Sequence, residues 1–423
     1  MKKSVKIRLI IFKILLEIYK KSSNFESSYN KITKNTNIST NDRSLINNVC
    51  LNSLRLQFHI NQILNSFLTK KPKINQYILL LNAVTQLIYL NFKDYAVIDD
   101  SVEISKKINV NPGLINGVLR NILRNKNKLE GKKVDYNALP KWFVKNSKNL
   151  NQKNKDDFVK TFFKEPNLHI VFKNKHLLKN FKNKHFISTT TSAFILESKK
   201  VKDLYNYKQG DWWVQDFSSM LPIYLSSEIS KKKILDLCAA PGGKLFQEIL
   251  KGSKVHANDI NENKIEILKN NLKRLKINSK ITNKNALKLE LKEKYDVIII
   301  DAPCTSVGTI RRNPEIFFKK NPPNIISLVN LQRKLMDKAS LLLNKNGIII
   351  YMVCSFLYEE TEAQIDYFLK IHKNFSLLKF SKIENEKNIN NFINNKGYIL
   401  HVPKTYKNFL IDGFFAVKFI KNV

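Results

Sequence analysis

The sequence predicts an α/β protein in which a Rossmann-like domain follows an all-α domain. Three observations support this fold class. Apolar residues recur at helical spacing through the first part of the chain, strands alternate with helices from about Ile234, and a turn of small residues, CAAPGGK, stands between a strand and a helix. Such alternation is typical of βαβ units, which build a parallel sheet covered by helices on both faces.

The chain has 423 residues, more than one ordinary core accommodates, so we expect two or three domains. The expected division is an all-α domain over residues 1–126, a linker with a small α/β segment over 127–225, and the Rossmann-like domain over 226–423. The stretch from Lys126 to Asp135 is rich in Lys and Asn and has the composition of a linker.

The N-terminal stretch MKKSVKIRLIIFKILLEIYKK is predicted to be an amphipathic helix rather than a signal peptide. Lys13 and Glu17 interrupt its apolar run, and no small-residue cleavage site follows. Helical spacing continues in LINNVCLNSLRLQFHINQIL, where Cys50 is expected to be a buried structural thiol. No other stretch is long and apolar enough to cross a bilayer, so we expect no membrane association.

The chain is strongly basic, with 73 Lys and Arg residues against 35 Asp and Glu residues and a formal net charge of +38. This excess favours a polyanionic partner such as nucleic acid, bound with salt-sensitive affinity. The abundance of Lys, Asn and Ile also fits drift toward A/T-rich codons. Four cysteines without a CxxC pair and seven scattered histidines give neither a zinc-ligand spacing nor a disulfide framework, a pattern that favours a metal-free protein of the reducing cytoplasm.

The turn in LDLCAAPGGKLFQEIL occupies the position where doubly wound folds bind nucleotide-like ligands. Gly242 and Gly243 would let the backbone approach the ligand closely. The turn matches neither GxGxxG nor the P-loop, because Leu245 follows Lys244 where a P-loop has Ser or Thr. After the next strand, Asp259 is placed to bond ribose hydroxyls, although a strand-end Asp can also cap a helix. An adenosine ligand without a pyrophosphate fits best, and S-adenosylmethionine is the candidate cofactor.

Two cysteines and an acid are predicted at the carboxyl edge of the sheet. The runs YDVIIID and GIIIYMVCS end at Asp301 and Cys354, and Cys304 follows the first of them. Together they indicate methyl transfer to C5 of a pyrimidine, because a thiolate that adds at C6 makes C5 nucleophilic. The second thiol could assist product release, and Asp301 could neutralise charge near N3. The spacing leaves open which cysteine attacks.

These motifs resemble those of the Nol1/Nop2/Sun family of RNA cytosine-5 methyltransferases. The resemblance rests on DLCAAPGGK, DAPC, IRRNPE and MVCS, which together are highly specific, and it extends nearly end to end. The segments DRSLINNVCLNSLR, YAVIDDSVEIS and GLINGVLRNILR resemble a NusB-like domain. The resemblance therefore implies a NusB-like all-α domain followed by a Rossmann-like S-adenosylmethionine-dependent methyltransferase domain.

The resemblance also assigns roles to single residues. It implies that Cys354 attacks C6 and that Cys304 helps to free the product, with Asp301 close to the target base as well as to the cofactor. Where the family has an aspartate near the adenine this chain has Asn285, which would lose a charge but keep an acceptor. The residues implied to line the cofactor site are Cys238, Ala239, Ala240, Pro241, Gly242, Gly243, Lys244, Asp259, Asn285 and Asp301.

The implied substrate is an unpaired or flipped-out cytosine, because a thiol at a sheet edge cannot reach C5 and C6 inside a helix. The N-terminal resemblance points to 16S small-subunit ribosomal RNA, naked or in a partly assembled particle, and we expect a monomer. Arg311 and Arg312 could fork onto phosphates near the target or form structural ion pairs.

Other functions stay open at this stage. Cytosine methyltransferases for transfer RNA or another ribosomal site share the same motifs. An RNA-binding ribosome assembly factor with little turnover would not need intact Cys304, Cys354 and Asp301. A nicotinamide-dependent dehydrogenase would need GxGxxG and would leave the two thiols without a role. Retention of a cofactor by the purified protein would separate the last two alternatives.

Overall fold

A computed structural model describes residues 1–129, 134–182, 184–196 and 200–422, so residues 130–133 of the predicted linker lie outside the described part. The chain forms two compact units. One consists of Met1–Lys145, Phe162–Glu165 and Ile310–Pro323, and the other of Asn146–Thr161, Pro166–Thr309 and Asn324–Val423. These units are defined by contacts between residues and not by independent folding. The domain bounds expected from sequence therefore stay predictions.

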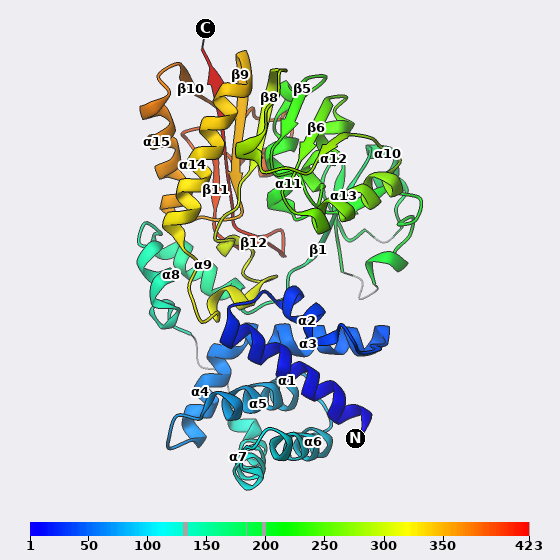
Figure 1. The fold of residues 1–423 in the computed structure, drawn as a ribbon, viewed down its shortest axis with the longest axis vertical. Coiled ribbons are helices and arrows are strands. Elements are labelled where there is room, and N and C mark those ends of the chain that lie inside the picture. Colours follow the sequence, from blue (N-terminus) through cyan, green and yellow to red (C-terminus); the bar gives the residue numbers. More distant parts are fainter. Residues whose placement is uncertain (130–133, 183, 197–199, 423) are drawn as a thin grey trace. The chain divides into compact units, whose positions relative to one another are not determined.

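The first unit is helical, as the sequence predicts (Figure 1). In its first helix, apolar residues such as Ile11 and Leu15 are buried, which is the amphipathic pattern expected. Asn111 caps the helix that begins at Pro112 by accepting from the amides of Gly113 and Leu114. The helices are α1 (Lys3–Lys21), α2 (Phe25–Thr33), α3 (Thr40–Arg55), α4 (Gln57–Phe67), α5 (Ile74–Val84), α6 (Asp94–Lys107) and α7 (Pro112–Arg124).

The segment Ile310–Pro323 also belongs to the helical unit, although it follows the DAPC motif in sequence. Arg55 Nη2 in α3 donates a hydrogen bond to the carbonyl oxygen of Arg311, 3.0 Å away. The Phe318 ring lies 5.4 Å from the ring of Phe58 in α4. The Arg311 side chain is fully buried, which favours the structural alternative over the predicted contact with an external phosphate.

The second unit begins with short helices and a small antiparallel sheet of strand order β2-β3-β1-β4. The predicted extended segments NLHIVF and DWWVQDF contain β1 and β4, and their Phe172 pairs with Trp212. Helix α8 (Lys141–Asn146) belongs to the helical unit up to Lys145. The following elements are α9 (Gln152–Phe162), β1 (Leu168–Phe172), α10 (Lys175–Asn180), β2 (Phe186–Thr189), β3 (Ser192–Ile195), β4 (Trp212–Val214) and α11 (Phe217–Tyr224).

The main sheet of this unit has the strand order β10-β14-β9-β8-β5-β6-β7, and β11 pairs with β14. A separate hairpin joins β12 (Lys404–Tyr406) to β13 (Phe409–Ile411). The strands of the main sheet are β5 (Lys233–Asp236), β6 (Lys254–Asn258), β7 (Lys280–Thr282), β8 (Tyr295–Asp301), β9 (Leu343–Val353), β10 (Phe375–Leu378), β11 (Ile399–His401) and β14 (Phe414–Lys421).

The strands β7, β6, β5, β8 and β9 are parallel neighbours, as predicted. Because β5 pairs with both β6 and β8, the chain reverses its direction of winding at β5. The carboxyl ends of β5 and β8 therefore form the switch point at which such folds bind ligands. By contrast, β14 runs antiparallel to β9 and β10, an arrangement that the sequence did not predict.

Helices cover both faces of the main sheet. Ile299 and Ile350 share one core with the helices α11, α12 (Gly243–Leu250) and α13 (Glu262–Leu275). Their neighbours Ile298 and Ile349 share the other core with α14 (Ile325–Leu342) and α15 (Glu362–Ile371), seen in Figure 1. Burial on both faces explains why the strands are continuous apolar runs rather than alternating ones.

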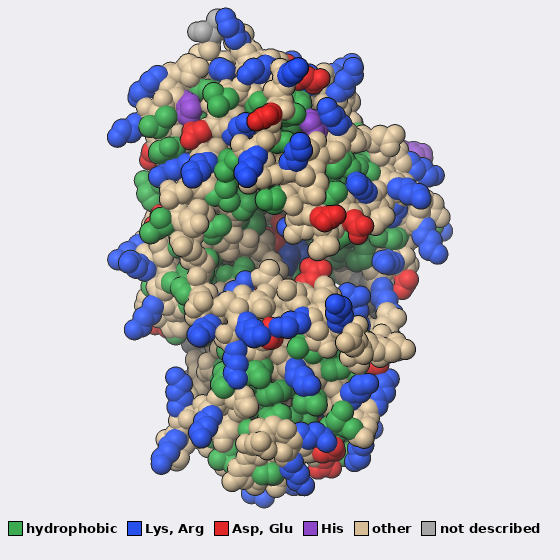
Figure 2. Space-filling view, viewed as in Figure 1, with side chains coloured by type: hydrophobic (Ala, Val, Ile, Leu, Met, Phe, Trp, Pro, Cys, Tyr) green, Lys and Arg blue, Asp and Glu red, His purple; other side chains and the backbone are tan. Residues whose placement is uncertain are grey.

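The surface is broadly basic. Lys and Arg side chains are spread over the face seen in Figure 2 rather than gathered in one patch. Within the described ranges, no helix combines the length and the apolarity needed to cross a membrane.

Candidate active site

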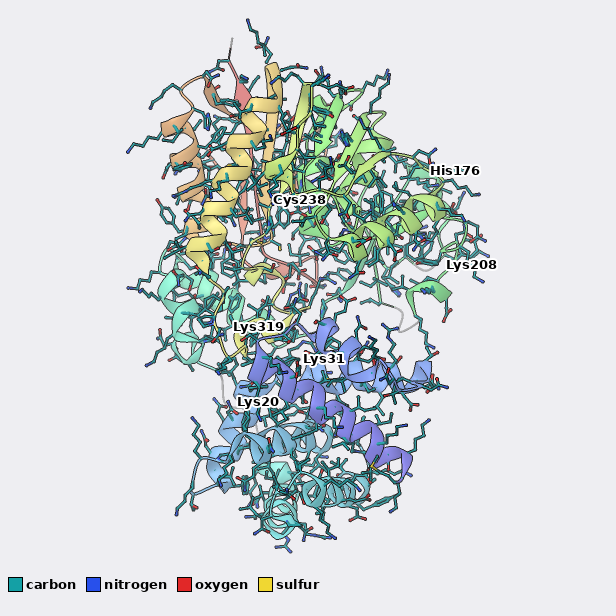
Figure 3. All side chains as sticks on the ribbon, in the orientation of Figure 1. Lys20, Lys31, His176, Lys208, Cys238 and Lys319 are labelled. Carbon is teal, nitrogen blue, oxygen red and sulfur yellow. The ribbon has the colours of Figure 1, made fainter. Side chains whose placement is uncertain are left out.

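Most of the predicted site residues meet at the carboxyl edge of the main sheet. The turn Cys238–Lys244 joins β5 to α12, Asp259 follows β6, Asp301 ends β8, and Cys354 follows β9. Figure 3 labels Cys238, which lies where β5 gives way to this turn. The strand-end rule therefore placed the acid and the thiols at the same edge from sequence alone.

Backbone amides of the cofactor turn are already hydrogen-bonded within the protein. Position 241 is proline and has no amide hydrogen. The part of the turn before Gly242 therefore offers no free amide to a phosphate, in agreement with the absence of a P-loop motif. The bonds run from the amide of Cys238 to Asp236 Oδ1 (3.2 Å), from Ala239 to the carbonyl of Asn258 (2.9 Å), and from Ala240 to Asp259 Oδ2 (3.1 Å).

Gly242 is required by the shape of the turn. Its φ of +113° lies in the region that residues with a side chain rarely adopt. A Cβ atom at this position would stand 2.4 Å from Phe246 Cζ and 2.6 Å from Leu268 Cδ1. The chain can therefore pass closely over α12 only with glycine.

Asp259 supports the turn through its side chain. Its Oδ2 accepts from the amide of Ala240 and its Oδ1 accepts from the amide of Asn261, 2.9 Å away, at the start of α13. The structural alternative for Asp259 is thus realised. A carboxylate has about four lone-pair positions, so ribose hydroxyls could still be bound.

Asn258, which the sequence analysis did not select, ties two loops together. It is fully buried at the end of β6. Its Nδ2 donates to the carbonyl of Leu237 at 3.2 Å and to that of Lys284 at 3.0 Å. The loop that contains Asn285 is thereby held beside the cofactor turn. The half-buried Asn285 itself caps a short helix through the amide of Leu287.

Lys244 and Asp301 form an ion pair across the edge. Lys244 Nζ lies 2.6 Å from Asp301 Oδ2 and 2.9 Å from Ser219 Oγ. Burial of Lys244 alone would lower its pKa, but the charge of Asp301 and the hydrogen bond to it raise the pKa above the usual value. Lys244 therefore remains protonated at neutral pH.

Asp236 is a second acid at this edge that the sequence analysis quoted without assigning. It is 1% exposed, and burial, followed by the charge of Asp301, raises its pKa to about 8. Burial and then the charges of Asp236, Asp301 and Asp259 hold the pKa of Cys238 well above its usual value. Cys238 therefore stays a neutral thiol and is a poor nucleophile. The strand-end position of Asp236 in LDLC was the signal for it.

The other two cysteines of the edge face each other. Cys304 Sγ and Cys354 Sγ lie 3.4 Å apart. The hydrogen bond between them lowers the pKa of Cys354 and raises the pKa of Cys304. A thiolate is therefore favoured on Cys354, with Cys304 as the S–H donor. Cys50 is instead buried in α3, and burial raises its pKa, as expected for a structural thiol.

Gly308 fastens the Cys304 loop to the strand that carries Cys354. Its amide donates to the carbonyl of Cys354 at 3.0 Å, and its carbonyl accepts from the amide of Gly413 at 2.9 Å. A Cβ on Gly308 would lie 2.1 Å from the carbonyl oxygen of Gly413. Only glycine at position 308 allows this approach of three backbone segments.

Glu360 anchors the same loop from the other side and was also missed. Its two oxygens accept from the amide of Thr305 (2.8 Å) and from Thr305 Oγ1 (2.5 Å). Gln332 Nε2 in α14 donates to the same carboxylate at 3.1 Å. The pair of glutamates in FLYEETEAQI could not indicate this role, because Glu360 and Thr305 are 55 positions apart.

No arrangement of His, Cys, Asp and Glu suited to a metal ion occurs in the part of the chain that the structure describes. The chemistry available at the edge is thus that of two thiols, a lysine and carboxylates. It combines a nucleophilic sulfur, a neighbouring S–H group and a charged pair, beside a turn whose amides before Gly242 are already bonded within the protein.

Comparison with known proteins adds the family. Residues 223–420 match the family model 16S rRNA methyltransferase RsmB/F, and residues 5–124 match the NusB family. Similar curated proteins include Ribosomal RNA small subunit methyltransferase B from Photorhabdus laumondii, 28% identical over 401 residues, which span 89% of this chain and 93% of that protein. The protein of that name from Yersinia enterocolitica is 27% identical over 403 residues, 90% of this chain and 93% of its own.

Solved structures agree on the fold. The crystal structure of PH0851 aligns with a TM-score of 0.72 and 20% identity over 100% of this chain and 99% of its own. A methyltransferase homolog from Pyrococcus horikoshii aligns with a TM-score of 0.52 and 22% identity over 66% of this chain and 94% of its own. The chain thus combines a domain that matches the NusB family model, over residues 5–124, with a domain that matches the 16S rRNA methyltransferase RsmB/F family model, over residues 223–420.

Proposed function

We propose that this protein methylates C5 of an unpaired or flipped-out cytosine in 16S ribosomal RNA, through a covalent bond between Cys354 and C6 of the base. The observation that carries the proposal is the pair of thiols, with sulfurs 3.4 Å apart, at the sheet edge beside the cofactor turn. The family model and the names of the curated relatives supply the RNA, because both refer to small-subunit ribosomal RNA.

The turn Cys238–Lys244 and Asp259 fit S-adenosylmethionine, which supplies an electrophilic methyl group when bound. The absence of free amides before Gly242 suits an adenosine that carries no phosphate. After burial, the charges of Asp301 and Asp259 are among the causes that raise the pKa of Cys238, and they indicate negative potential at the turn. Negative potential favours a sulfonium cation. Asp259 can bond the ribose.

In the first half of the reaction, the Cys354 thiolate forms a bond to C6. The π electrons of the C5–C6 bond move to C5, which takes the methyl group. The S–H group of Cys304 stabilises the thiolate before attack, since it is the donor that lowers the pKa of Cys354. Addition places negative charge near N3, and the Lys244 ammonium, held 2.6 Å from Asp301 Oδ2, is the group of this ion pair that can offset it.

In the second half, Cys304 can act as the base. The hydrogen bond to Cys354 is the largest factor that raises the pKa of Cys304. Once the sulfur of Cys354 is bonded to C6, that factor is gone and Cys304 can release its proton to solvent. Its thiolate then accepts the proton from C5, the C–H electrons rebuild the C5–C6 double bond, and Cys354 leaves as a thiolate.

The test is transfer of radiolabelled methyl from S-adenosylmethionine to unmodified 16S RNA, naked and in a partly assembled subunit. Wild type should form 5-methylcytosine, Cys354→Ala should form neither product nor adduct, and Cys304→Ala should accumulate a protein–RNA adduct on a denaturing gel. Cys50→Ala is the matched control and should behave as wild type.

Three results would contradict the assignment. Methylation by Cys354→Ala, with no adduct from Cys304→Ala, would reverse the roles of the thiols. Methylation of transfer RNA or of 23S RNA in preference to 16S RNA would move the substrate. Tight RNA binding by wild type without any transfer would favour the assembly-factor function.

A further inference from the structure

We propose that the Ser306 hydroxyl donates a hydrogen bond to the sulfur of Cys354 and holds it in its anionic, nucleophilic form. This inference rests on the proposed function, in which Cys354 attacks the base. Ser306 would then be a catalytic residue, because its hydroxyl touches the reacting sulfur.

The geometry places one hydroxyl against both thiols. Ser306 Oγ lies 3.4 Å from Cys354 Sγ and 3.8 Å from Cys304 Sγ, while the two sulfurs are 3.4 Å apart. The hydroxyl hydrogen can rotate toward whichever sulfur is charged. While Cys354 is a thiol, its S–H donates to Ser306 Oγ, and the Ser306 hydroxyl donates to the carbonyl oxygen of Cys304 at 3.5 Å, which is long for an O–H···O bond. A thiolate can only accept, so loss of the Cys354 proton reverses the bond and the hydroxyl turns from this distant carbonyl to the sulfur. The hydroxyl is therefore available to the thiolate.

The backbone at Ser306 is held in an uncommon conformation. Its φ is +60°, in the left-handed region where residues other than Gly, Asn and Asp are rare. The amide and the hydroxyl of Thr309 both donate to the carbonyl of Ser306 at 2.9 Å, which fixes this conformation. Positions of this kind cluster at functional sites, where the surrounding structure keeps a side chain in one direction. Here that direction is toward the two sulfurs.

The other groups that act on Cys354 do not make the hydroxyl redundant. Cys304 is a second donor, Asp301 opposes the thiolate by its negative charge, and Lys244 favours it. The Lys244 ammonium is already bonded to Asp301 and Ser219, so its charge is largely balanced where Cys354 lies. Ser306 is thus the donor that can stabilise the thiolate without carrying charge and without being consumed as a base later.

The hydroxyl keeps its proton throughout the reaction. Before attack, the Cys354 proton passes to solvent and Ser306 O–H points to the anionic sulfur. When the S–C6 bond forms, the sulfur loses its charge and this hydrogen bond weakens. On release, the electrons of the S–C6 bond return to sulfur as the C5–C6 double bond is rebuilt, and the hydrogen bond strengthens again. Ser306 therefore favours release as well as attack.

The experiment measures how fast iodoacetamide alkylates Cys354 as a function of pH, by mass analysis of the peptide that contains it. The Cys304→Ala background isolates a single thiol, so the loss of Ser306 can be read without coupling to Cys304. In that background, Ser306→Ala should raise the pH midpoint by about one unit, which corresponds to about tenfold slower alkylation at neutral pH. Ser306→Gly removes the same hydroxyl but suits a positive φ.

The two substitutions separate the hydroxyl from the backbone. Equal shifts in Ser306→Ala and Ser306→Gly would support the proposal. An unchanged midpoint in both would overturn it, as would a shift in Ser306→Ala alone, because backbone conformation would then be the cause. In the chain with Cys304 intact, methyl transfer by Ser306→Ala should be slowest relative to wild type at low pH and should approach it at high pH.

Failure of this proposal can be told apart from failure of the proposed function. Alkylation needs neither RNA nor cofactor, so the midpoint tests Ser306 even if wild type transfers no methyl group. Conversely, a protein that methylates 16S RNA with the same alkylation midpoint in both Ser306 variants would keep the proposed function and lose the role of Ser306.

Discussion

The amide of Gly308 donates a hydrogen bond to the carbonyl oxygen of Cys354 across 3.0 Å, so the loop that carries one thiol is fastened to the strand end that carries the other. The separation of the two sulfurs therefore depends on a backbone contact as well as on the cysteines. Substitution at Gly308 should change the reaction without removing any functional group.

Gly308→Ala should impair activity through this contact. Its Cβ would meet the carbonyl oxygen of Gly413 at 2.1 Å and that of Cys354 at 2.9 Å, so backbone segments must move apart. We expect a loss of about 1–3 kcal/mol in unfolding free energy and a larger relative loss of methyl transfer. Urea denaturation and single-turnover transfer measure the two effects. Gly117→Ala in α7 is the control, since nothing lies within 4 Å of its Cβ position; activity equal to wild type in both variants would contradict the expectation.

Asp236→Asn should make the unfolding free energy fall less steeply as pH rises. The buried carboxyl keeps its proton up to about pH 8, whereas in the unfolded chain it ionises near pH 3.8. Folding therefore takes up a proton within this window, and stability falls as pH rises, by about 1.4 kcal/mol per pH unit for one proton. The amide cannot ionise but can still accept from the amide of Cys238. Denaturation at several pH values gives the unfolding free energy of wild type and Asp236→Asn. The difference between the two proteins should be smallest near pH 4 and should favour the variant increasingly up to pH 8. A difference that does not change with pH would show that Asp236 is already ionised in the folded protein.

The pH profile of methyl transfer should report the ionisation of Cys354. Because its pKa lies below the ordinary value, kcat/KM should rise with pH and level off before a free cysteine, with its pKa of about 8.5, would do so. Cys304→Ala removes the donor that lowers this pKa, so the onset of adduct formation should move to higher pH. A profile with the same midpoint in both proteins would mean that Cys304 does not act on Cys354.

Lys244→Met should leave Asp301 with a charge that lacks its partner. The ammonium lies 2.6 Å from Asp301 Oδ2, and no other cation is recorded as bonded to that carboxylate among the described residues. We expect methyl transfer to fall by about 10²-fold or more, as for removal of an electrostatic group in a reaction centre. The measurement is kcat/KM for RNA beside the equilibrium affinity for the cofactor. Lys254→Met, on the exposed start of β6, is a matched control; an equal loss in the two variants would point to general RNA attraction.

The sequence predicted the methyltransferase half of the fold well because its strands are buried on both faces. A strand buried on both faces, such as β8 with its run VIII, contains consecutive apolar residues. The β8 run ends at Asp301, and the corresponding run in β9 is followed by Cys354. The rule that ligands bind at carboxyl ends then brought Asp301, Cys304 and Cys354 together before any coordinates were considered. The N-terminal helices were predictable for a similar reason, since their apolar spacing is regular.

Other features depend on contacts between residues far apart in sequence. The direction of β14 follows from its pairing with β9 and β10, and its residues alone do not encode it. The anchoring of Thr305 by Glu360 joins two loops, and the position of Ser306 depends on a backbone angle. Asp259 was predicted at the correct edge, but its bonds to the turn and to α13 become visible only in three dimensions.

The segment Ile310–Pro323 connects the loop that contains Cys304 covalently to the helical unit. Cys304 is carried by the second unit, whereas the chain enters the helical unit at Ile310, where Arg55 and Phe58 hold it. Along the backbone, residues 305–309 separate Cys304 from the segment that Arg55 and Phe58 contact. We therefore expect that the helical unit cannot be removed without affecting the Cys304 loop. A shortened chain without residues 1–125 would lose the Phe58 ring that packs on Phe318, and the loop that contains Cys304 would be less constrained.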